Sequence, residues 1–244
     1  MTKPYPHLPN APIVEAVFDI RCRLPEGCES SAIETAVQKL KSDYPVARKQ
    51  LVQAHEFKVE LGKKTELKSI KGLRGVQIEK QDKKQIVQMQ RDGFSLNRLR
   101  PYTSFDELMP EVMRCWQIYA EATKPAELTR IALRTINRIE LPMGFAQARE
   151  AFQIALETTF PDLKQTGFLH RWSLAGNDCF ATVTLATRPP AETTVPVVLD
   201  IDAYKTLDLD SKIDALKRDF SLLRELKNDI FFGSLTAGWI DQYK

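Results

Sequence analysis

The chain has 244 residues, a formal net charge of +3 and 27% charged residues, as expected of an ordinary globular protein. The charge is uneven, because residues 1–124 hold 21 Lys/Arg against 16 Asp/Glu and residues 125–244 hold 14 against 16. This basic excess is far below that of a dedicated nucleic-acid-binding domain. No apolar run reaches the roughly 18 residues of a transmembrane helix, so we expect no membrane partner.

The cysteines predict a reducing environment. None of the four belongs to a Cys-x-x-Cys pair, and three lie in apolar or strand-like patterns, where a free thiol behaves as a small hydrophobic group. The N-terminal residues also lack the apolar core of a signal peptide. We therefore expect a cytoplasmic protein.

Two strand-like stretches organise the sequence. In residues 11–24 apolar and polar side chains alternate with a period of two, which predicts a strand with one buried face. Residues 128–141 form a second such stretch. Both end in Leu-Pro-x-Gly, and the two endings lie 117 residues apart. The aromatic-Pro pairs that begin at Tyr44 and Phe160 lie 116 residues apart, so we interpret the chain as two related halves.

The first half continues with a helix and several strands. Ser31 and Glu34 have the spacing of a capping box, and Pro45 follows the end of the predicted helix. Alternating patterns then predict strands within residues 46–61 and 72–99. Turn-forming residues place turns at Gly72–Gly75, Gln81–Lys83 and Asp92–Gly93.

A second capping box, from Ser104 to Glu107, opens a long predicted helix. Its apolar stripe comprises Phe105, Leu108, Val112, Cys115, Trp116 and Tyr119. Proline removes an interior hydrogen bond, so the helix either kinks at Pro110 or begins near Met109.

The second half repeats this order. A helix is predicted over residues 145–157, with Phe145, Ala148, Phe152 and Leu156 on its apolar side. Strands are predicted at residues 166–175, 178–188 and 195–204. The last helix starts near Asp208 or Asp210, and its apolar stripe comprises Leu209, Ile213, Leu216, Phe220, Leu223 and Leu226.

These elements predict an α+β fold made of a tandem pseudo-repeat of β-α-β-β-β(-β)-α units. Residues 1–124 would form the first half and residues 125–244 the second, packed as one globular unit. The two halves would share one antiparallel sheet with helices on one face, as in a helix-grip or saddle-like fold, and the other face would stay uncovered.

The uncovered face would carry arginines from both halves. On strand 128–141, Arg130 shares its parity with two further arginines, and Arg21 corresponds to one of them in the repeat. The candidate ligand-binding residues are Glu15, Arg98, Arg100, Arg134, Asn137 and Arg138. Arginine binds carboxylate and phosphate in a bidentate manner, so this face could bind an anion, a peptide or a nucleic acid. Alternatively, these arginines are ordinary exposed residues paired with acids on neighbouring strands.

Catalytic motifs are missing from the sequence. It contains no Gly-x-Ser-x-Gly, Walker loop, dinucleotide fingerprint or His-Glu-x-x-His. His7, His55 and His170 lack ligand spacing and are interpreted as surface or packing residues. Asp200 and Asp202 share a strand face and could bind a metal, although a solvated or salt-bridged pair is the preferred interpretation. We predict no catalytic residues, no metal and no cofactor.

Five stretches of the sequence carry a resemblance to known proteins: Pro12–Val17, Phe94–Tyr102, Leu133–Ile139, Leu199–Asp202 and Asn228–Thr236. Together they resemble a sporadically distributed family of uncharacterised bacterial hypothetical proteins. Thr135 stands where the family usually has an aromatic residue. The family has no assigned activity, so the resemblance implies no catalytic residues. Its sporadic distribution implies an accessory role, for example in defence or in mobile elements.

Three functions remain open at the level of sequence. The preferred one is a non-enzymatic binding or regulatory module whose arginine-bearing sheet face takes an anionic ligand or a protein, including a second copy of the chain. The first alternative is a nucleic-acid-binding protein that uses the same face as a saddle. The second alternative is an enzyme with a cleft between the halves, built on Glu15, Arg98, Arg134 and Arg138.

Overall fold

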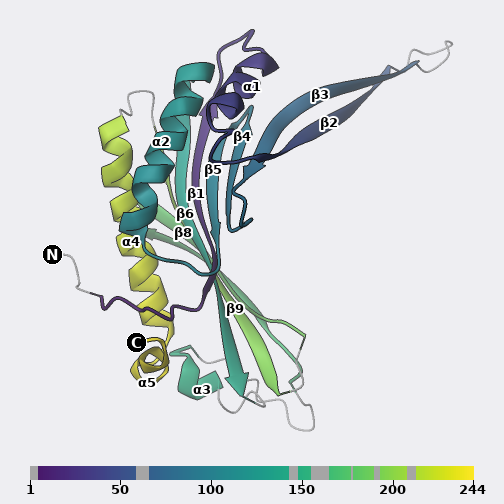
Figure 1. The fold of residues 1–244 in the computed structure, drawn as a ribbon. Helices are drawn as coiled ribbons and strands as arrows, with labels where there is room; N and C mark the ends of the chain where they lie inside the picture. The colour runs from purple at the N-terminus through teal and green to yellow at the C-terminus, as the bar shows by residue number, and fades with distance from the viewer. Residues whose placement is uncertain are drawn as a thin grey trace.

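A nine-stranded antiparallel sheet forms the centre of the computed structural model, which describes residues 5–58, 66–142, 148–154, 165–176, 178–189, 193–207 and 213–244 (Figure 1). In chain order its elements are β1 (Ile13–Arg23), α1 (Ser30–Lys39), β2 (Val46–Lys58), β3 (Glu66–Glu79), β4 (Gln85–Gln90), β5 (Gly93–Leu99), α2 (Phe105–Thr123), β6 (Glu127–Pro142), α3 (Ala148–Ala151), β7 (Leu169–Gly176), β8 (Cys179–Thr187), β9 (Thr194–Thr206), α4 (Ile213–Ser234), α5 (Ala237–Ile240) and the 3-10 helix η2 (Asp241–Tyr243).

The strand order places the two predicted opening strands side by side at the centre of the sheet. The order is β2-β3-β4-β5-β1-β6-β9-β8-β7, so β1 pairs with β6. The register opposes Val17 to Arg134 and Phe18 to Leu133. Each of these strands is flanked on its other side by the last strand of its own half, β5 beside β1 and β9 beside β6.

Helices α1, α2 and α4 lie on the same side of the sheet in Figure 1. The strands bury one set of alternate residues towards these helices. Phe18 and Ile20 of β1 are 0% exposed and belong to the larger core cluster, whereas the intervening Asp19 and the neighbouring Arg21 belong to a polar surface. We call the side of the sheet opposite these three helices the open face. None of the described helices is long and apolar enough to cross a membrane.

One core cluster joins the two halves of the sequence. Phe18 of β1 contacts Phe105 of α2 and Phe220 of α4, with ring centroids 5.8 and 5.7 Å apart. The same cluster contains Ile131 and Leu133 of β6. A second cluster lies at the other end of the helix side, between β6, β8, β9 and the C-terminal helices.

Both predicted helix starts in the first half can be compared with the structure, and one of them is wrong. Ser104 caps α2 as predicted, since its hydroxyl accepts from the Glu107 amide at 3.1 Å. Helix α1, however, begins at Ser30 after an extended Glu29, without a side-chain cap. The Ser31 hydroxyl instead donates to the Glu29 carboxylate at 3.1 Å, so it is not the capping acceptor that the box requires.

The predicted turn at Gly72–Gly75 is also wrong, because both glycines lie within β3. Gly75 pairs with Gln90 of β4, and a Cβ atom at this position would lie 2.8 Å from the Gln90 Cα atom. The glycine therefore permits two strands to approach closely. The turn at Gln81–Lys83 is confirmed, and a turn joins β4 to β5 as predicted, although it comprises Arg91 and Asp92 and Gly93 already begins β5.

The helix predicted over residues 145–157 is much shorter in the described part of the chain. It spans Ala148–Ala151, after which Phe152 forms a bridge with Leu235, and the Gln153 amide donates to the Ser234 carbonyl at 3.0 Å. Pairing with the end of α4 thus replaces further helical hydrogen bonds. Phe145, Leu156 and the predicted starts of the last helix at Asp208 or Asp210 lie outside the described residues.

Pro110 lies inside α2, which begins at Phe105 and not near Met109. The stripe predicted for this helix is buried, including Trp116 and Tyr119.

Candidate functional site

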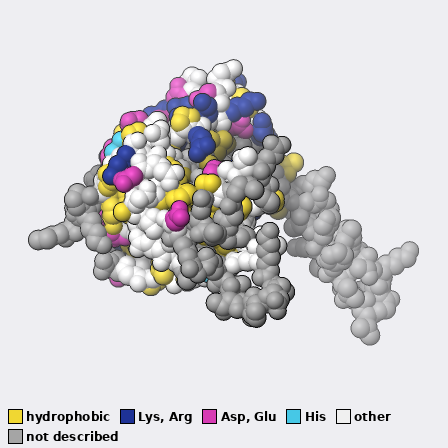
Figure 2. Space-filling view, turned by 90° about the horizontal axis from the view of Figure 1, so that it is seen from below, with side chains coloured by type: hydrophobic (Ala, Val, Ile, Leu, Met, Phe, Trp, Pro, Cys, Tyr) yellow, Lys and Arg dark blue, Asp and Glu magenta, His cyan; other side chains and the backbone are white. Residues whose placement is uncertain are grey.

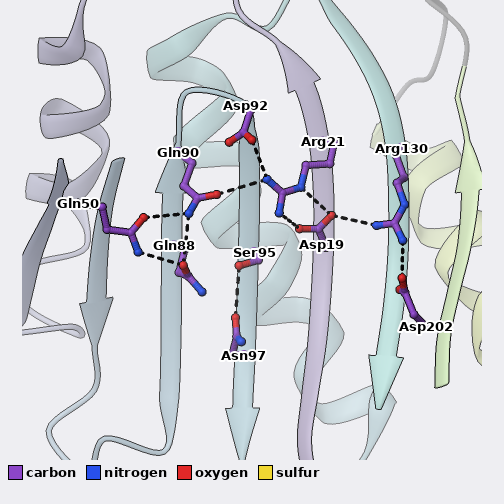
Figure 3. A network of polar contacts seen from close by, with 10 residues as sticks. All are labelled: Asp19, Arg21, Gln50, Gln88, Gln90, Asp92, Ser95, Asn97, Arg130 and Asp202. Carbon is purple, nitrogen blue, oxygen red and sulfur yellow. Dashed lines mark hydrogen bonds and ion pairs between the residues drawn. The ribbon is translucent and has the colours of Figure 1, made fainter. Parts of the chain in front are cut away.

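A polar network crosses the open face from β2 to β9 (Figure 3). At one end Gln50 of β2 bonds to Gln88 and Gln90 of β4, with distances of 3.2 and 2.9 Å. Gln90 then accepts from Arg21 of β1 at 3.3 Å. The antiparallel register brings these side chains together, because residues of one parity on neighbouring strands point to the same face.

Asp19 is the centre of this network. Its carboxylate accepts two bonds from Arg21, at 3.0 and 2.9 Å, and a third from Arg130 of β6 at 3.4 Å. Asp19 is only 8% exposed although it lies on the open face. Burial raises the pKa of this carboxyl group above its ordinary value, and the two arginines only partly offset that effect. Arg21 also binds Asp92 at 3.1 Å, so each of its three guanidinium nitrogen atoms has a partner.

An aromatic stack adjoins the network on the β9 side. Arg130 donates to Asp202 of β9 at 2.7 Å, and its guanidinium carbon lies 4.5 Å from the ring centroid of Tyr204. Tyr204 in turn stacks on Phe180 of β8, with ring centroids 5.6 Å apart. We call Arg130, Tyr204 and Phe180 the aromatic stack. Phe180 is 37% exposed, so the stack presents an apolar ring to solvent.

Two further arginines of β6 are paired with acids. Arg134 binds both oxygens of Asp200 on β9, at 2.8 and 2.5 Å, and hydrogen bonding to this carboxylate raises the pKa of the guanidinium. Arg138 donates to Glu140 at 2.5 Å. Burial opposes the charge of Glu140, but hydrogen bonds from Thr194 and Arg138 lower its pKa below the ordinary value. The salt-bridged interpretation of the Asp200 and Asp202 pair agrees with these contacts.

The six candidate residues do not share one surface. Glu15 lies on the open face, where it accepts from Asn97 at 2.6 Å, and Arg134 and Arg138 lie there as well. Arg98 follows the parity of the buried Leu96 and donates to the Pro101 carbonyl at 3.1 Å, so it belongs to the helix side.

The other two candidates, Arg100 and Asn137, differ in exposure. Arg100 is exposed beyond the end of β5, where its backbone amide donates to the Val14 carbonyl at 3.0 Å. Asn137 is 1% exposed and has the strand parity of Leu133, which faces the helices. The assumption that all six residues line one uncovered face is therefore wrong for Arg98 and Asn137, because their positions in the pleat turn them to the helix side.

Sequence reasoning gave Asp200 and Asp202 as a solvated or salt-bridged pair, but it did not identify Asp19 as a partner or show which arginine meets which acid. Asp19, Asp200 and Asp202 were visible as polar members of alternating strands, but their partners depend on which strands are neighbours. Once β6 is known to lie between β1 and β9, the register opposes Arg134 to Asp202 and places Arg130 near Asp19. With the strand order known, the alternation of side chains along each strand indicates which polar residues meet on the open face.

The open face carries paired charges and one exposed aromatic ring. In the part of the chain that the structure describes, no group of three or more His, Cys, Asp and Glu residues could hold a metal ion. On the side of the molecule drawn in Figure 2, Lys and Arg side chains lie among Asp and Glu side chains, with hydrophobic side chains scattered between them. Arg21, Arg130, Arg134 and Arg138 each have a carboxylate partner.

No protein-family model matches the chain, and no curated protein sequence matches it.

Proposed function

We propose that this protein is a non-enzymatic binding module whose open face binds a partner protein. The observation that carries this proposal is the aromatic stack beside a network of paired charges, on a sheet face that α1, α2 and α4 do not cover. Tyr and Arg are, with Trp, the residue types that are enriched among the residues dominating the binding energy of protein interfaces. Charges held in place by neighbours add specificity at a small entropic cost.

A protein fits this face better than a nucleic acid or a simple anion. The bidentate contact of Arg134 with Asp200 occupies the donors that a phosphate would need, and Arg21 is engaged in the same way. A polyanion would have to displace these carboxylates and overcome their repulsion. A protein surface with both signs of charge can instead pair with the arginines and the acids together.

We further propose that the two halves are structural copies arranged as a helix-grip or saddle-like fold. The support comes from the register of the central strands, in which Val17 lies opposite Arg134. These residues are 117 positions apart, the same separation as the two Leu-Pro-x-Gly endings. If two similar halves are related by a twofold axis between β1 and β6, each residue at that axis lies opposite its counterpart in the other half. Val17 and Arg134 would be such counterparts. The flanking of β1 by β5 and of β6 by β9 follows the same relation.

A cytoplasmic location is part of the proposal. It is supported by the state of the cysteines, because Cys22, Cys28, Cys115 and Cys179 are all free thiols and three of them are buried.

Site-specific photo-crosslinking in cells that produce the protein naturally tests the binding proposal. A photoreactive phenylalanine analogue at Thr182, which opposes Asp202 on the open face, should yield a discrete cross-linked protein. The same analogue at exposed Lys217 of α4 should not yield it. Phe180→Ala should reduce the Thr182 product by about tenfold or more, because it removes the exposed ring of the stack.

The matched control is Leu222→Ala, which removes an exposed apolar side chain of α4 that is 41% exposed. It should leave the Thr182 product unchanged. A product that is equal at positions 182 and 217, or that ignores Phe180→Ala, would refute binding through the open face. A product that contains two copies of the chain would show that the partner is a second copy and that the open face forms a homodimer.

A further inference from the structure

A cavity of about 150 Å³ lies on the helix side of the sheet, remote from the open face. Its walls come from five separate parts of the chain: the N-terminal segment around Tyr5–Leu8, the start of β1, the residues before and at the start of α2, the middle of β6, and α4. It therefore lies where the two halves of the sequence meet. Among its apolar wall residues are Ile13, Phe105, Leu133, Phe231 and Phe232.

The charges at this cavity are unbalanced. Lys227 and Arg224 of α4 both line it, whereas none of the lining residues that the structure describes is Asp or Glu. Arg224 is neutralised from outside, since it binds Asp106 at 3.1 Å and lies over the Phe105 ring at 4.9 Å. Among the described residues Lys227 has no such neighbour. Burial and the positive charge of Arg224 both lower its pKa, to about 8, and no described acid offsets them. Burying a cation without a counter-ion lowers the stability of the folded protein. A lysine at this position therefore calls for an explanation.

A second polar side chain at the cavity has one atom without a hydrogen-bond partner among the described residues. Asn137 of β6 is 1% exposed, and its Nδ2 atom donates to the Leu199 carbonyl at 2.9 Å. Its Oδ1 atom is buried and has no hydrogen-bond partner in the described part of the chain. Buried side-chain oxygens nearly always have a hydrogen-bond donor, so Oδ1 of Asn137 is an acceptor with which a donor on a ligand in this cavity would pair.

We propose that this cavity binds a small organic carboxylate whose charged group pairs with Lys227 and whose apolar body packs against Phe231, Phe232 and Leu133. The carboxylate would supply the missing counter-ion, and a hydroxyl or amino donor on the same ligand would satisfy Asn137. A cavity of about 150 Å³ has room for one benzene-sized molecule, so we expect a ligand with a single ring or a short branched chain.

The N-terminal segment forms one wall of this site. The Tyr5 ring stacks on Phe232 with centroids 4.4 Å apart, and the Tyr5 hydroxyl donates to Asp229. These contacts place the N-terminal segment across α4 beside Lys227. There the segment would shield the ion pair between Lys227 and the ligand carboxylate from water. Ion pairs are stronger where water is excluded. The proposal concerns a site on the opposite side of the sheet from the protein-binding face and does not depend on it.

Binding of benzoate, of 3-methylbutanoate and of the neutral isostere benzamide tests the proposal on the full chain. Calorimetry measures affinity, and amide chemical shifts of Asn137, Lys227 and Phe232 locate the ligand. At pH 7 we expect at least one carboxylate to shift these signals and benzamide to bind about tenfold or more weakly. Lys227→Met should weaken carboxylate binding by a similar factor.

Lys217→Met, on the exposed side of the same helix, is the matched control and should leave carboxylate affinity unchanged. The proposal is overturned if neither carboxylate shifts the cavity signals, if benzamide binds as tightly as benzoate, or if Lys227→Met binds the carboxylate as well as the wild type. Shifts confined to the open face would also overturn it, because the ligand would then lie elsewhere.

Discussion

Phe18→Ala is expected to lower the free energy of unfolding by about 3–5 kcal/mol, the usual cost of removing a buried aromatic side chain. Phe18 is 0% exposed and touches the rings of Phe105 and Phe220. The cavity left by the substitution would therefore open between β1, α2 and α4, which belong to different halves of the sequence. Urea denaturation followed by tryptophan fluorescence and by circular dichroism measures the effect.

The two probes should report one coincident transition, before and after the substitution, because one core cluster contains residues of both halves. Phe180→Ala is the matched control, since Phe180 is 37% exposed and lies on the open face. It should cost less than about 1.5 kcal/mol, the range of an aromatic pair contact. Two separate transitions, or equal losses for the two phenylalanines, would contradict a core shared by the halves.

Lys227→Met is expected to stabilise the free protein at pH 7 and to lose that advantage as the pH rises. The pKa of Lys227 is lowered by burial and by Arg224 from 10.5 in the unfolded chain to about 8 in the folded chain. Between these values the unfolded state binds more protons, so wild-type stability increases with pH. The gain in wild-type stability is complete above the pKa that Lys227 has in the unfolded chain, and it is lost as the pH falls through about 8. It amounts to about 3 kcal/mol.

The difference in unfolding free energy between wild type and Lys227→Met, measured from pH 7 to pH 10.5, isolates this effect. Other ionisable groups near the cavity are common to both proteins and cancel: Tyr5 and His7 on the N-terminal segment, Tyr102 before α2, and Arg224 and Asp229 on α4. Lys217→Met should follow the wild type throughout. A difference that does not vary with pH would mean that Lys227 is not held as an unpaired, buried cation.

Local patterns predicted the strands because each has one apolar face. The period-two alternation of residues 11–24 and 128–141 corresponds to β1 and β6, and the parity of Arg130, Arg134 and Arg138 placed them correctly on one face. The errors arose where the role of a residue depends on packing against a part of the chain that is distant in sequence. Gly75 was interpreted as a turn residue, but its missing side chain makes room for β4.

The candidate sites were harder to predict, since both depend on strand order. The network around Asp19 draws on β2, β4, β1, β6 and β9, and nothing local indicates which strands are neighbours. The cavity did leave a signal in the sequence. Lys227 lies seven residues after Phe220 and four after Leu223, so a lysine occupies a position of the buried stripe of α4. Asn137 is likewise a polar residue at an inward position of β6.

The central claim is that the arginines of the open face are already neutralised by carboxylates, so that the face binds a protein and not a polyanion. Titration with single-stranded DNA at about 0.05 M salt, followed by amide and arginine side-chain signals, tests it most directly. We expect the signals of Arg130, Arg134 and Arg138 to remain unchanged. Salt-dependent shifts of these three arginines would contradict the claim and would favour a nucleic-acid saddle.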